Sequence, residues 1–261
     1  MNREERTTQN SELKTMKTFA LVGRNISYSF SRRYFAEKFA QEKITDCEYI
    51  NFDIPTIEAL SALIRATPTL VGMNVTIPYK EAVLPLLDQQ SEELVAIKAC
   101  NTIKIGSLGQ LKGYNTDYIG FRDSLVPYLK PHHNRALILG TGGASKAVAF
   151  ALSQLGIPYQ LVSREASSVA LSYHELTKEV IQSHFLIVNT TPLGTSPKTE
   201  EFPPIPYQWI MREHLLYDLI YNPEKTTFLA KGEVQGATIL NGYPMLVLQA
   251  EAAWKIWNSE Q

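Results

Sequence analysis

Residues 136–144 read Ala-Leu-Ile-Leu-Gly-Thr-Gly-Gly-Ala, an apolar strand that runs directly into a glycine turn. The residues that follow, 143–155, have the pattern of a helix. A sharp strand-to-helix turn needs glycine for its backbone angles, and a second glycine lets a pyrophosphate approach the amides of the helix N-terminus. Gly140 and Gly142 fit these two roles. Ser145 stands where the general dinucleotide fingerprint has Gly or Ala, so the preceding strand carries the prediction of a dinucleotide site.

Strands and amphipathic helices alternate on both sides of this turn. After it, we predict strands at 159–162, 185–189, 215–219 and 238–240 and a closing helix at 244–257. Before it, we predict strands at 19–22, 47–52 and 70–75, a hairpin of 101–105 and 108–113, and helices at 32–43 and 57–65. Parallel strands joined by crossover helices form a doubly wound sheet, so the predicted fold class is α/β.

A change of pattern near residue 116 divides the chain into two domains. Residues 117–129 have a helical pattern that Pro131 and the polar residues 132–134 end before the next strand. With 261 residues, 44% of them hydrophobic, the chain can bury two modest cores. Residues 1–15 are polar and lack the apolar centre of a signal peptide, so we expect a disordered extension there.

Composition excludes several classes of partner. The net charge of −1 and the pI of about 6.5 argue against a surface for nucleic acid or for an anionic membrane. No apolar run reaches the roughly 18 residues that a membrane span requires. Cys47, Cys100 and the histidines show no metal-ligand spacing, so no metal site is expected. We therefore expect a cytoplasmic protein with a small-molecule partner.

The end of the strand after the glycine turn bears on the choice of cofactor. Enzymes that use NAD usually carry a carboxylate about 20 residues beyond the turn, where it binds the ribose hydroxyls. This chain has Ser163-Arg164 instead, and an arginine can form a fork of hydrogen bonds to a 2′-phosphate. The sequence therefore favours NADP, although the carboxylate of Glu165 would repel that phosphate. The alternative is that Arg164 is a solvated loop residue.

Two motifs upstream of the turn supply a lysine and an aspartate. Residues 72–80 read Gly-Met-Asn-Val-Thr-Ile-Pro-Tyr-Lys, and residues 113–117 read Gly-Tyr-Asn-Thr-Asp. Hydride transfer to a carbonyl needs a proton donor, and a neighbouring carboxylate keeps a lysine ammonium charged. Lys80 and Asp117 are therefore our candidate catalytic pair. Composition alone equally allows Lys80 to be an exposed side chain and Asp117 to be a helix cap.

The motifs taken together resemble those of the shikimate dehydrogenase family over residues 19–257. The resemblance lies in the runs 72–80, 101–102, 115–117, 140–144, 217–223 and 245–250. It implies a reversible NADPH-dependent reduction of 3-dehydroshikimate to shikimate, on the route to chorismate and aromatic amino acids. It also implies a catalytic dyad, in which Lys80 donates the proton during ketone reduction and Asp117 orients it.

The resemblance further implies which residues bind the substrate. Ser29, Ser31 and Tyr221 match residues that hold the substrate carboxylate in the family. The residues that match positions around the ring hydroxyls are Asn74, Thr76, Lys80, Asn101, Asp117 and Gln249. Because Gln249 lies on the closing helix, residues 242–261 should return to residues 16–116 and complete the substrate-binding domain.

The resemblance assigns residues 117–241 to a Rossmann-type dinucleotide-binding domain. The residues that it implies at the NADP site are Gly140, Thr141, Gly142, Gly143, Ala144, Ser163, Arg164, Asn189, Thr190, Leu219 and Gly242. The expected ligands are thus NADP and shikimate or 3-dehydroshikimate, and the chain is expected to be a monomer or a homodimer.

Three departures from the family pattern keep alternatives open. Arg32 replaces a common proline, where it either adds charge near the substrate carboxylate or starts the helix. Glu165 and Ser168 weaken the case for NADP over NAD. The alternatives are a quinate/shikimate dehydrogenase with NAD or mixed cofactor use, and a non-catalytic ligand-sensing protein of the same fold. Lys80 and Asp117 argue against the sensor.

Overall fold

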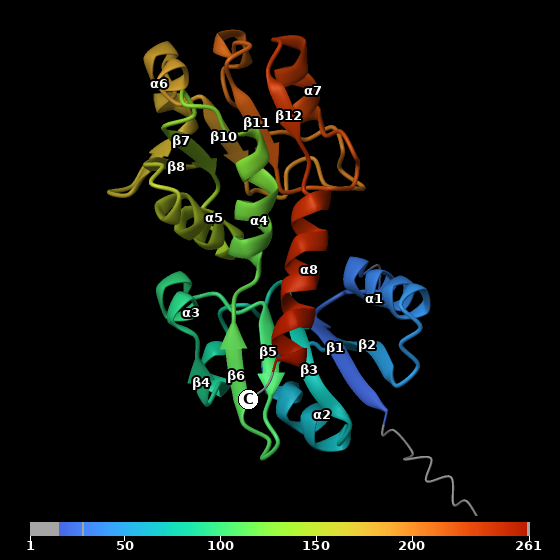
Figure 1. Cartoon of the computed structure of the whole chain (residues 1–261). Helices are drawn as coiled ribbons and strands as arrows, with labels where there is room; N and C mark the ends of the chain where they lie inside the picture. The colour runs from blue at the N-terminus through green and yellow to red at the C-terminus, as the bar shows by residue number, and fades with distance from the viewer. Residues whose placement is uncertain (1–15, 28, 260–261) are drawn as a thin grey trace, which may run out of the picture.

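The computed structural model describes residues 16–27 and 29–259, so the expected disordered extension at residues 1–15 lies outside the described residues. Two α/β units follow one another along the long axis of the molecule, and each contains one sheet (Figure 1). We call them the N-terminal unit, which holds strands β1–β6, and the C-terminal unit, which holds strands β7–β12. The predicted α/β fold class is confirmed.

The sheet of the N-terminal unit is mixed. Its strand order is β2-β1-β3-β5-β6-β4. The strands are β1 (Lys17–Gly23), β2 (Cys47–Asp53), β3 (Leu70–Val75), β4 (Gln89–Gln90), β5 (Thr102–Ile105) and β6 (Leu111–Tyr114). Strand β1 is parallel to β2 and β3, whereas β5 runs antiparallel to β3 and β6, which confirms the predicted hairpin. The helices of this unit are α1 (Phe30–Gln41), α2 (Leu60–Ala66) and α3 (Glu92–Ile97).

The sheet of the C-terminal unit is parallel throughout, with the order β12-β11-β10-β7-β8-β9. Its strands are β7 (Ala136–Leu139), β8 (Tyr159–Ser163), β9 (Ala170–Ser172), β10 (Leu186–Asn189), β11 (Leu215–Asp218) and β12 (Thr238–Leu240). Its helices are α5 (Gly143–Gln154), α6 (Lys178–Gln182) and α7 (Thr227–Val234). The order reverses at β7, as in a doubly wound Rossmann-type sheet, so the sequence prediction is confirmed.

Local chemistry explains where the structure departs from the predicted bounds. Helix α1 begins at Phe30 rather than at residue 32, because the Ser29 hydroxyl accepts a hydrogen bond from the Arg32 amide at 3.2 Å and caps the helix. Helix α4 (Asp117–Leu125) ends before residue 129 because Pro127 falls in a 3₁₀ turn. The sequence did not predict β4, β9, α3, α6 and α7.

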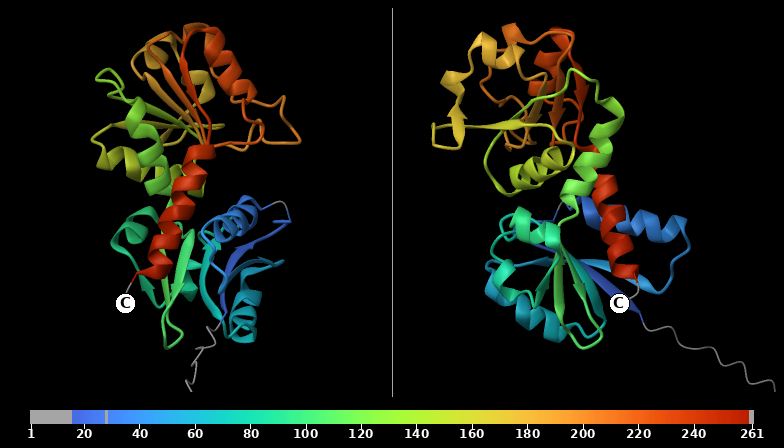
Figure 2. Two further views of the ribbon diagram at one scale, coloured as in Figure 1. Left: turned by 45° about the vertical axis from the view of Figure 1, so that its right-hand side comes forward. Right: turned by 60° about the vertical axis from the view of Figure 1, so that its left-hand side comes forward.

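Two helices join the units. Helix α4 and the closing helix α8 (Tyr243–Asn258) pack along one another, and α8 runs from the C-terminal unit down to the first sheet (Figures 1 and 2). There the indole N–H of Trp257 donates to the Ile103 carbonyl at 3.0 Å. A Cβ atom at Gly72 would lie 2.4 Å from the Trp257 ring, so the helix rests directly on β3. The predicted return of the C-terminal helix is confirmed.

Apolar side chains cover both faces of each sheet. Two clusters of buried residues, centred on Met73 and on Phe35, lie in the N-terminal unit. Two further clusters, centred on Ile138 and on Ile187, lie on opposite faces of the parallel sheet. Burial on both faces is what a parallel sheet requires, and it leaves the strand ends as the places for ligands. Across the described ranges, no helix combines the length and the apolar character needed to cross a membrane.

Candidate active site

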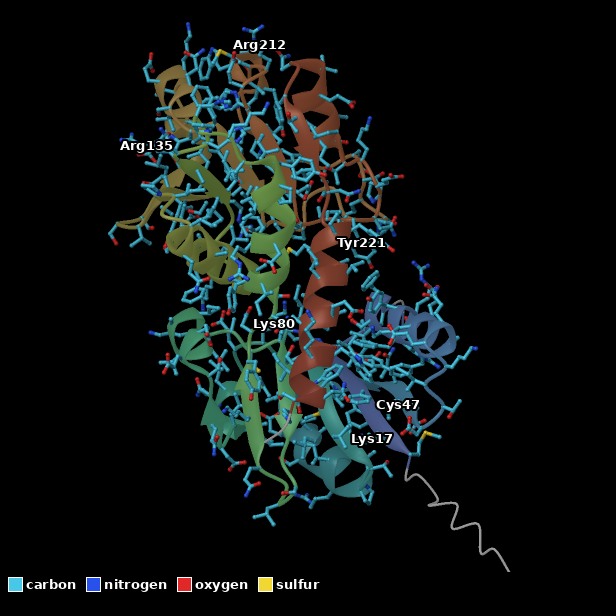
Figure 3. The ribbon with its side chains drawn as sticks, viewed as in Figure 1. Lys17, Cys47, Lys80, Arg135, Arg212 and Tyr221 are labelled. Carbon is cyan, nitrogen blue, oxygen red and sulfur yellow. The ribbon has the colours of Figure 1, made fainter. Side chains whose placement is uncertain are left out.

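A cavity of about 300 Å³ lies between the two units. Its walls come from the start of α1, the ends of β1 and β3, the starts of β5 and α4, and the middle of α8. The nine predicted substrate residues all line it: Ser29, Ser31, Asn74, Thr76, Lys80, Asn101, Asp117, Tyr221 and Gln249. Figure 3 shows Lys80 between the units, below α4 and beside α8, and Tyr221 higher up, at the edge of the C-terminal unit. The structure brings this set together, and the roles of its members toward a ligand stay predictions.

Lys80 and Asp117 form an ion pair in this cavity. The Nζ atom of Lys80 lies 2.6 Å from Oδ2 of Asp117, and the two side chains are 19% and 11% exposed. Asp117 is the first residue of α4, and the Cys100 amide donates to the Lys80 carbonyl at 2.7 Å, which ties the lysine backbone to the start of β5. Lys80 is therefore partly buried rather than exposed, and a partly buried ion pair attracts more strongly than a surface pair.

Asn101 holds the second oxygen of Asp117. Its Nδ2 atom donates to Oδ1 of Asp117 at 2.8 Å, while its own Oδ1 accepts from the Thr116 amide at 2.6 Å and from the Thr102 hydroxyl at 3.1 Å. Both Asp117 oxygens thus have donors, one charged and one neutral. The carboxylate is fixed in orientation, and so is the lysine ammonium that it faces.

A further layer of hydrogen bonds supports Asn101. Asn74 donates through Nδ2 to the Asn101 carbonyl and to the Thr102 hydroxyl, both at 3.2 Å, and its Oδ1 accepts from the Tyr49 hydroxyl at 2.8 Å. Burial raises the pKa of Tyr49, and a hydrogen bond with Ser31 acts in the opposite direction. Sequence reasoning missed Tyr49, because an aromatic residue in a strand is most simply core. The side chains of Asn74 and Asn101 form most of their hydrogen bonds with other protein groups. Their main role in this structure is therefore to position the Lys80–Asp117 pair.

The opposite side of the cavity offers hydroxyl and amide groups. Ser29 accepts the capping hydrogen bond at the start of α1, which leaves its O–H proton for a further acceptor. The Phe30 ring lies 5.7 Å from the Tyr221 ring, centroid to centroid, and thereby joins the N-terminal unit to the C-terminal unit. Gln249 of α8 donates to the Leu246 carbonyl at 2.9 Å, and its Oε1 lies 3.5 Å from Asn101 Nδ2.

The glycine turn has the shape that a phosphate requires. Gly140 has a φ of +109°, and a Cβ atom there would lie 2.7 Å from Thr190 Oγ1. At Gly142, by contrast, an added Cβ would meet no described atom within 4 Å, so the space in front of α5 is open. No side chain among the described residues caps α5, whose first amides therefore face this space. A dinucleotide pyrophosphate fits there, since helix N-termini bind anions.

The other predicted cofactor residues lie at the carboxyl ends of β8, β10 and β11 or at the start of α8, all on one edge of the parallel sheet. Arg164 is exposed just beyond β8, and the hydroxyl of Ser163 donates to the Glu165 carbonyl. At Gly242 a Cβ atom would lie 2.0 Å from the Leu219 carbonyl oxygen, so only glycine allows α8 to start this close to the end of β11.

Asn189 and Thr190 turn out to shape this edge. Asn189 is fully buried; its Nδ2 donates to Asp218 Oδ1 at 3.0 Å, and its Oδ1 accepts from the Thr191 hydroxyl at 2.7 Å. The Thr190 hydroxyl donates to the Leu139 carbonyl at 2.7 Å. Burial raises the pKa of Asp218 to about 6, against the effect of three hydrogen bonds. The side chains of Asn189 and Thr190 therefore hold strand ends together.

The Cys100 thiol lies near the site but offers no separate chemistry. Cys100 is fully buried beside Lys80, and burial raises the pKa of its thiol to about 12, so the thiol stays protonated at neutral pH. No group of three or more His, Cys, Asp or Glu side chains in the described part of the chain could hold a metal ion. Among the described residues that line the cavity, the charged side chains are those of Lys80 and Asp117.

Comparisons with known proteins identify relatives of this chain. Residues 21–103 match the family model for the shikimate dehydrogenase substrate binding domain. The chain is 34% identical over 259 residues to a shikimate dehydrogenase (NADP⁺) of Caldicellulosiruptor saccharolyticus, with 93% of this chain and 92% of that protein covered. It is similar to the structure of shikimate 5-dehydrogenase from Thermus thermophilus in complex with NADP(H) and shikimate, with a TM-score of 0.82, 31% identity and coverage of 93% and 94%.

A relative with another named substrate has the same architecture. The structure of quinate dehydrogenase from Corynebacterium glutamicum in complex with NAD matches with a TM-score of 0.83 and 25% identity, and the match covers 94% of each chain. The overall fold is thus shared by proteins that are named for different substrates and solved with different nucleotides. The choice between them depends on individual side chains in the two sites.

Proposed function

Because this chain belongs to the shikimate dehydrogenase family, we propose that Lys80 and Asp117 are the catalytic pair of an NADP⁺-dependent oxidoreductase that interconverts shikimate and 3-dehydroshikimate. One observation carries the proposal: the Lys80 ammonium lies 2.6 Å from the Asp117 carboxylate inside the cavity that the nine predicted substrate residues line. The reaction belongs to the biosynthesis of chorismate and aromatic amino acids.

The cavity residues divide the work of ketone reduction. Bound NADPH supplies the hydride for the ketone carbon. Lys80 donates a proton from Nζ to the oxygen as negative charge develops there, and in the reverse direction it accepts the hydroxyl proton. Asp117 orients the lysine ammonium through its Oδ2, while Asn101 prevents the carboxylate from rotating away. The hydride from NADPH and the proton from Lys80 together convert the ketone to the alcohol.

We assign the substrate carboxylate to the hydroxyls at the far side of the cavity. The Ser29 O–H proton is available for an anion, Ser31 lies beside it at the start of α1, and Tyr221 approaches from the C-terminal unit. Thr76 and Gln249 then face the ring hydroxyls, near Lys80 and Asp117. The proton donor Lys80 and the hydroxyls that bind the carboxylate lie at opposite ends of the cavity. Together they determine the orientation of the substrate ring.

We propose NADP⁺ as the cofactor, held by the glycine turn and by Arg164. The open space before α5 fits the pyrophosphate, and the exposed Arg164 guanidinium at the end of β8 can bind a 2′-phosphate. The alternative is quinate as substrate with NAD, and it is favoured by Glu165 next to Arg164 and by the quinate dehydrogenase relative solved with NAD. We also propose a cytoplasmic location, where NADPH is supplied.

The fold supports a division into two functional domains. Residues 16–116 with 242–261 are proposed as the substrate-binding domain, because α8 rests on β3 and contributes Gln249 to the cavity. Residues 117–241 are proposed as the dinucleotide-binding domain, because they contain the whole parallel sheet.

One assay tests these proposals together. Reduction of NADP⁺ and of NAD⁺ is followed by absorbance with shikimate and with quinate, in all four combinations. We expect turnover with shikimate and NADP⁺ to exceed that with the other three pairs. Preference for quinate and NAD⁺ would support the alternative, and absence of turnover with every pair would favour a ligand-sensing role.

A further inference from the structure

An ion pair joins the two units at the mouth of the proposed pyrophosphate site. The Nζ atom of Lys146, the fourth residue of α5, lies 2.8 Å from Oε1 of Glu81, and the side chains are 36% and 55% exposed. Glu81 directly follows Lys80 in the sequence. The pair therefore connects the helix that follows the glycine turn with the segment that carries the proposed proton donor.

The Glu81 carboxylate lies close to the beginning of α5. A Cβ atom built at Gly143, the first residue of α5, would be 3.9 Å from Glu81 Oε1 and 3.8 Å from Ala99 Cβ. The first turn of α5 contains no acidic residue, so the helix brings no anion of its own to its N-terminus. Glu81 brings a negative charge there from the other unit, near the place where the glycine turn leaves room for a phosphate.

We propose that Lys146 is a ligand of the cofactor pyrophosphate and that Glu81 is its counter-ion until the nucleotide binds. This inference rests on the proposed function and extends it to two residues outside the predicted site. A partly exposed ion pair contributes little free energy. A pyrophosphate that also accepts hydrogen bonds from the first amides of α5 can therefore displace the Glu81 carboxylate from Lys146. Glu81 and the nucleotide then compete for the same cation, and the competition weakens NADP⁺ binding.

The competition predicts opposite effects for the two partners. Lys146→Gln removes the cation and raises the dissociation constant of NADP⁺ by roughly tenfold. Glu81→Gln removes the competitor and lowers that constant by about threefold. If the ion pair only held the two units together, loss of either partner would change the NADP⁺ dissociation constant in the same direction. Opposite signs therefore separate the two roles.

The test is a titration of the full-length protein with NADP⁺ in the absence of substrate. Binding is measured by isothermal titration calorimetry at low ionic strength. Matched controls are Lys178→Gln on α6 and Glu58→Gln in the N-terminal unit, which leave the dissociation constant unchanged. Adenosine 2′-monophosphate, which lacks the pyrophosphate, serves as a second probe, and both site variants bind it like the wild type. Thermal melting confirms that the variants are folded.

The outcomes distinguish this inference from the proposed function. If the wild type binds NADP⁺ but Glu81→Gln binds it equally or more weakly, the competition is wrong. The same holds if Lys146→Gln binds NADP⁺ like the wild type. If the wild type itself does not bind NADP⁺, the proposed cofactor is wrong, and the inference falls with it.

Discussion

The proposed role of Lys80 depends on the side chains around it. The ammonium faces Asp117, the other oxygen of Asp117 faces Asn101, and the amide of Asn101 is held in turn by Thr116 and Thr102. Each member fixes the donor or acceptor direction of the next, so the pair is oriented before a substrate arrives. In the proposed reaction, such preorganisation would lower the cost of reaching the transition state.

We expect Lys80→Ala to lower kcat at least ~100-fold, because a positioned acid or base contributes on that scale. The melting temperature should stay close to that of the wild type, since the side chain packs at a cavity wall rather than in a core. Steady-state assays with shikimate and NADP⁺ measure the effect, and Lys178→Ala on α6 is the control. Turnover close to the wild-type value would remove this lysine from the mechanism.

Arg164 tests the choice of cofactor. Arg164→Ala should raise the KM for NADP⁺ by roughly tenfold and change the KM for NAD⁺ much less, because only NADP⁺ carries the 2′-phosphate. Glu165→Gln, one residue away, should act in the opposite direction on NADP⁺. Kinetics with both cofactors at saturating shikimate provide the comparison. Equal effects of Arg164→Ala on the two cofactors would show that the arginine does not contact the phosphate.

The turn between β7 and α5 combines two demands on glycine. At residue 140 the backbone conformation and the approach of Thr190 exclude a side chain, whereas at residue 142 the backbone is ordinary and the space is open. The first glycine serves the fold, and we infer that the second leaves room for the proposed pyrophosphate. Stability and cofactor affinity should therefore respond differently to substitution at these two positions.

We expect Gly140→Ala to lower the free energy of unfolding by about 1–3 kcal/mol, the cost of a side chain in a strained backbone region. Gly142→Ala should change that free energy by no more than about 0.5 kcal/mol, yet weaken NADP⁺ binding by ~10-fold because the methyl group enters the phosphate space. Denaturant unfolding and NADP⁺ titration of both variants separate the effects. A destabilised Gly142→Ala protein that binds NADP⁺ normally would contradict this division.

At the scale of the whole molecule, α8 links the two sites. Its first turn begins against Leu219 at the nucleotide edge, its middle contributes Gln249 to the cavity, and its end holds Trp257 against β3. Together with α4 it connects the two sheets (Figure 2). In the proposed reaction, the relative position of hydride donor and ketone would therefore depend on how α4 and α8 pack.

Three histidines in the C-terminal unit make its stability depend on pH. Burial lowers the pKa of His133, His184 and His214. Nε2 of His214 lies 3.1 Å from the Ile181 carbonyl, and Nδ1 accepts from the Met211 amide at 3.0 Å. Protonation of Nδ1 exchanges this bond for a longer one of 3.3 Å to the Met211 carbonyl. Because these folded-state values lie below the ordinary value near 6.5, their stabilising effect is complete above that pH and is lost as pH falls through them.

We expect His214→Gln to be less stable than the wild type at pH 7.5 and to lose less stability on acidification to pH 5. Asp218, whose pKa burial raises to about 6, has the opposite sign, so the difference between variant and wild type is the informative quantity. Urea unfolding across this pH range measures it, with the exposed His174→Gln as control. Parallel curves for His214→Gln and the wild type would refute the assignment.

Features with a local cause were readable from the chain. The apolar run before Gly140 predicted β7, and the glycine spacing predicted the turn, because strand period and turn geometry depend on neighbouring residues. Short elements such as β9 and α6 left no periodic signal, and their formation depends on packing against the parallel sheet. Bounds shifted where a single hydrogen bond acts, as at Ser29.

The candidate site shows the same distinction. Motif spacing identified Lys80 and Asp117 as a pair, although 37 residues separate them. Tyr49 behind Asn74 and the Lys146–Glu81 pair across the units had no sequence signal. Side-chain type and order along the chain define which chemistry is available. Which groups meet depends on long-range packing of two sheets and two connecting helices, and no local pattern encodes those distances.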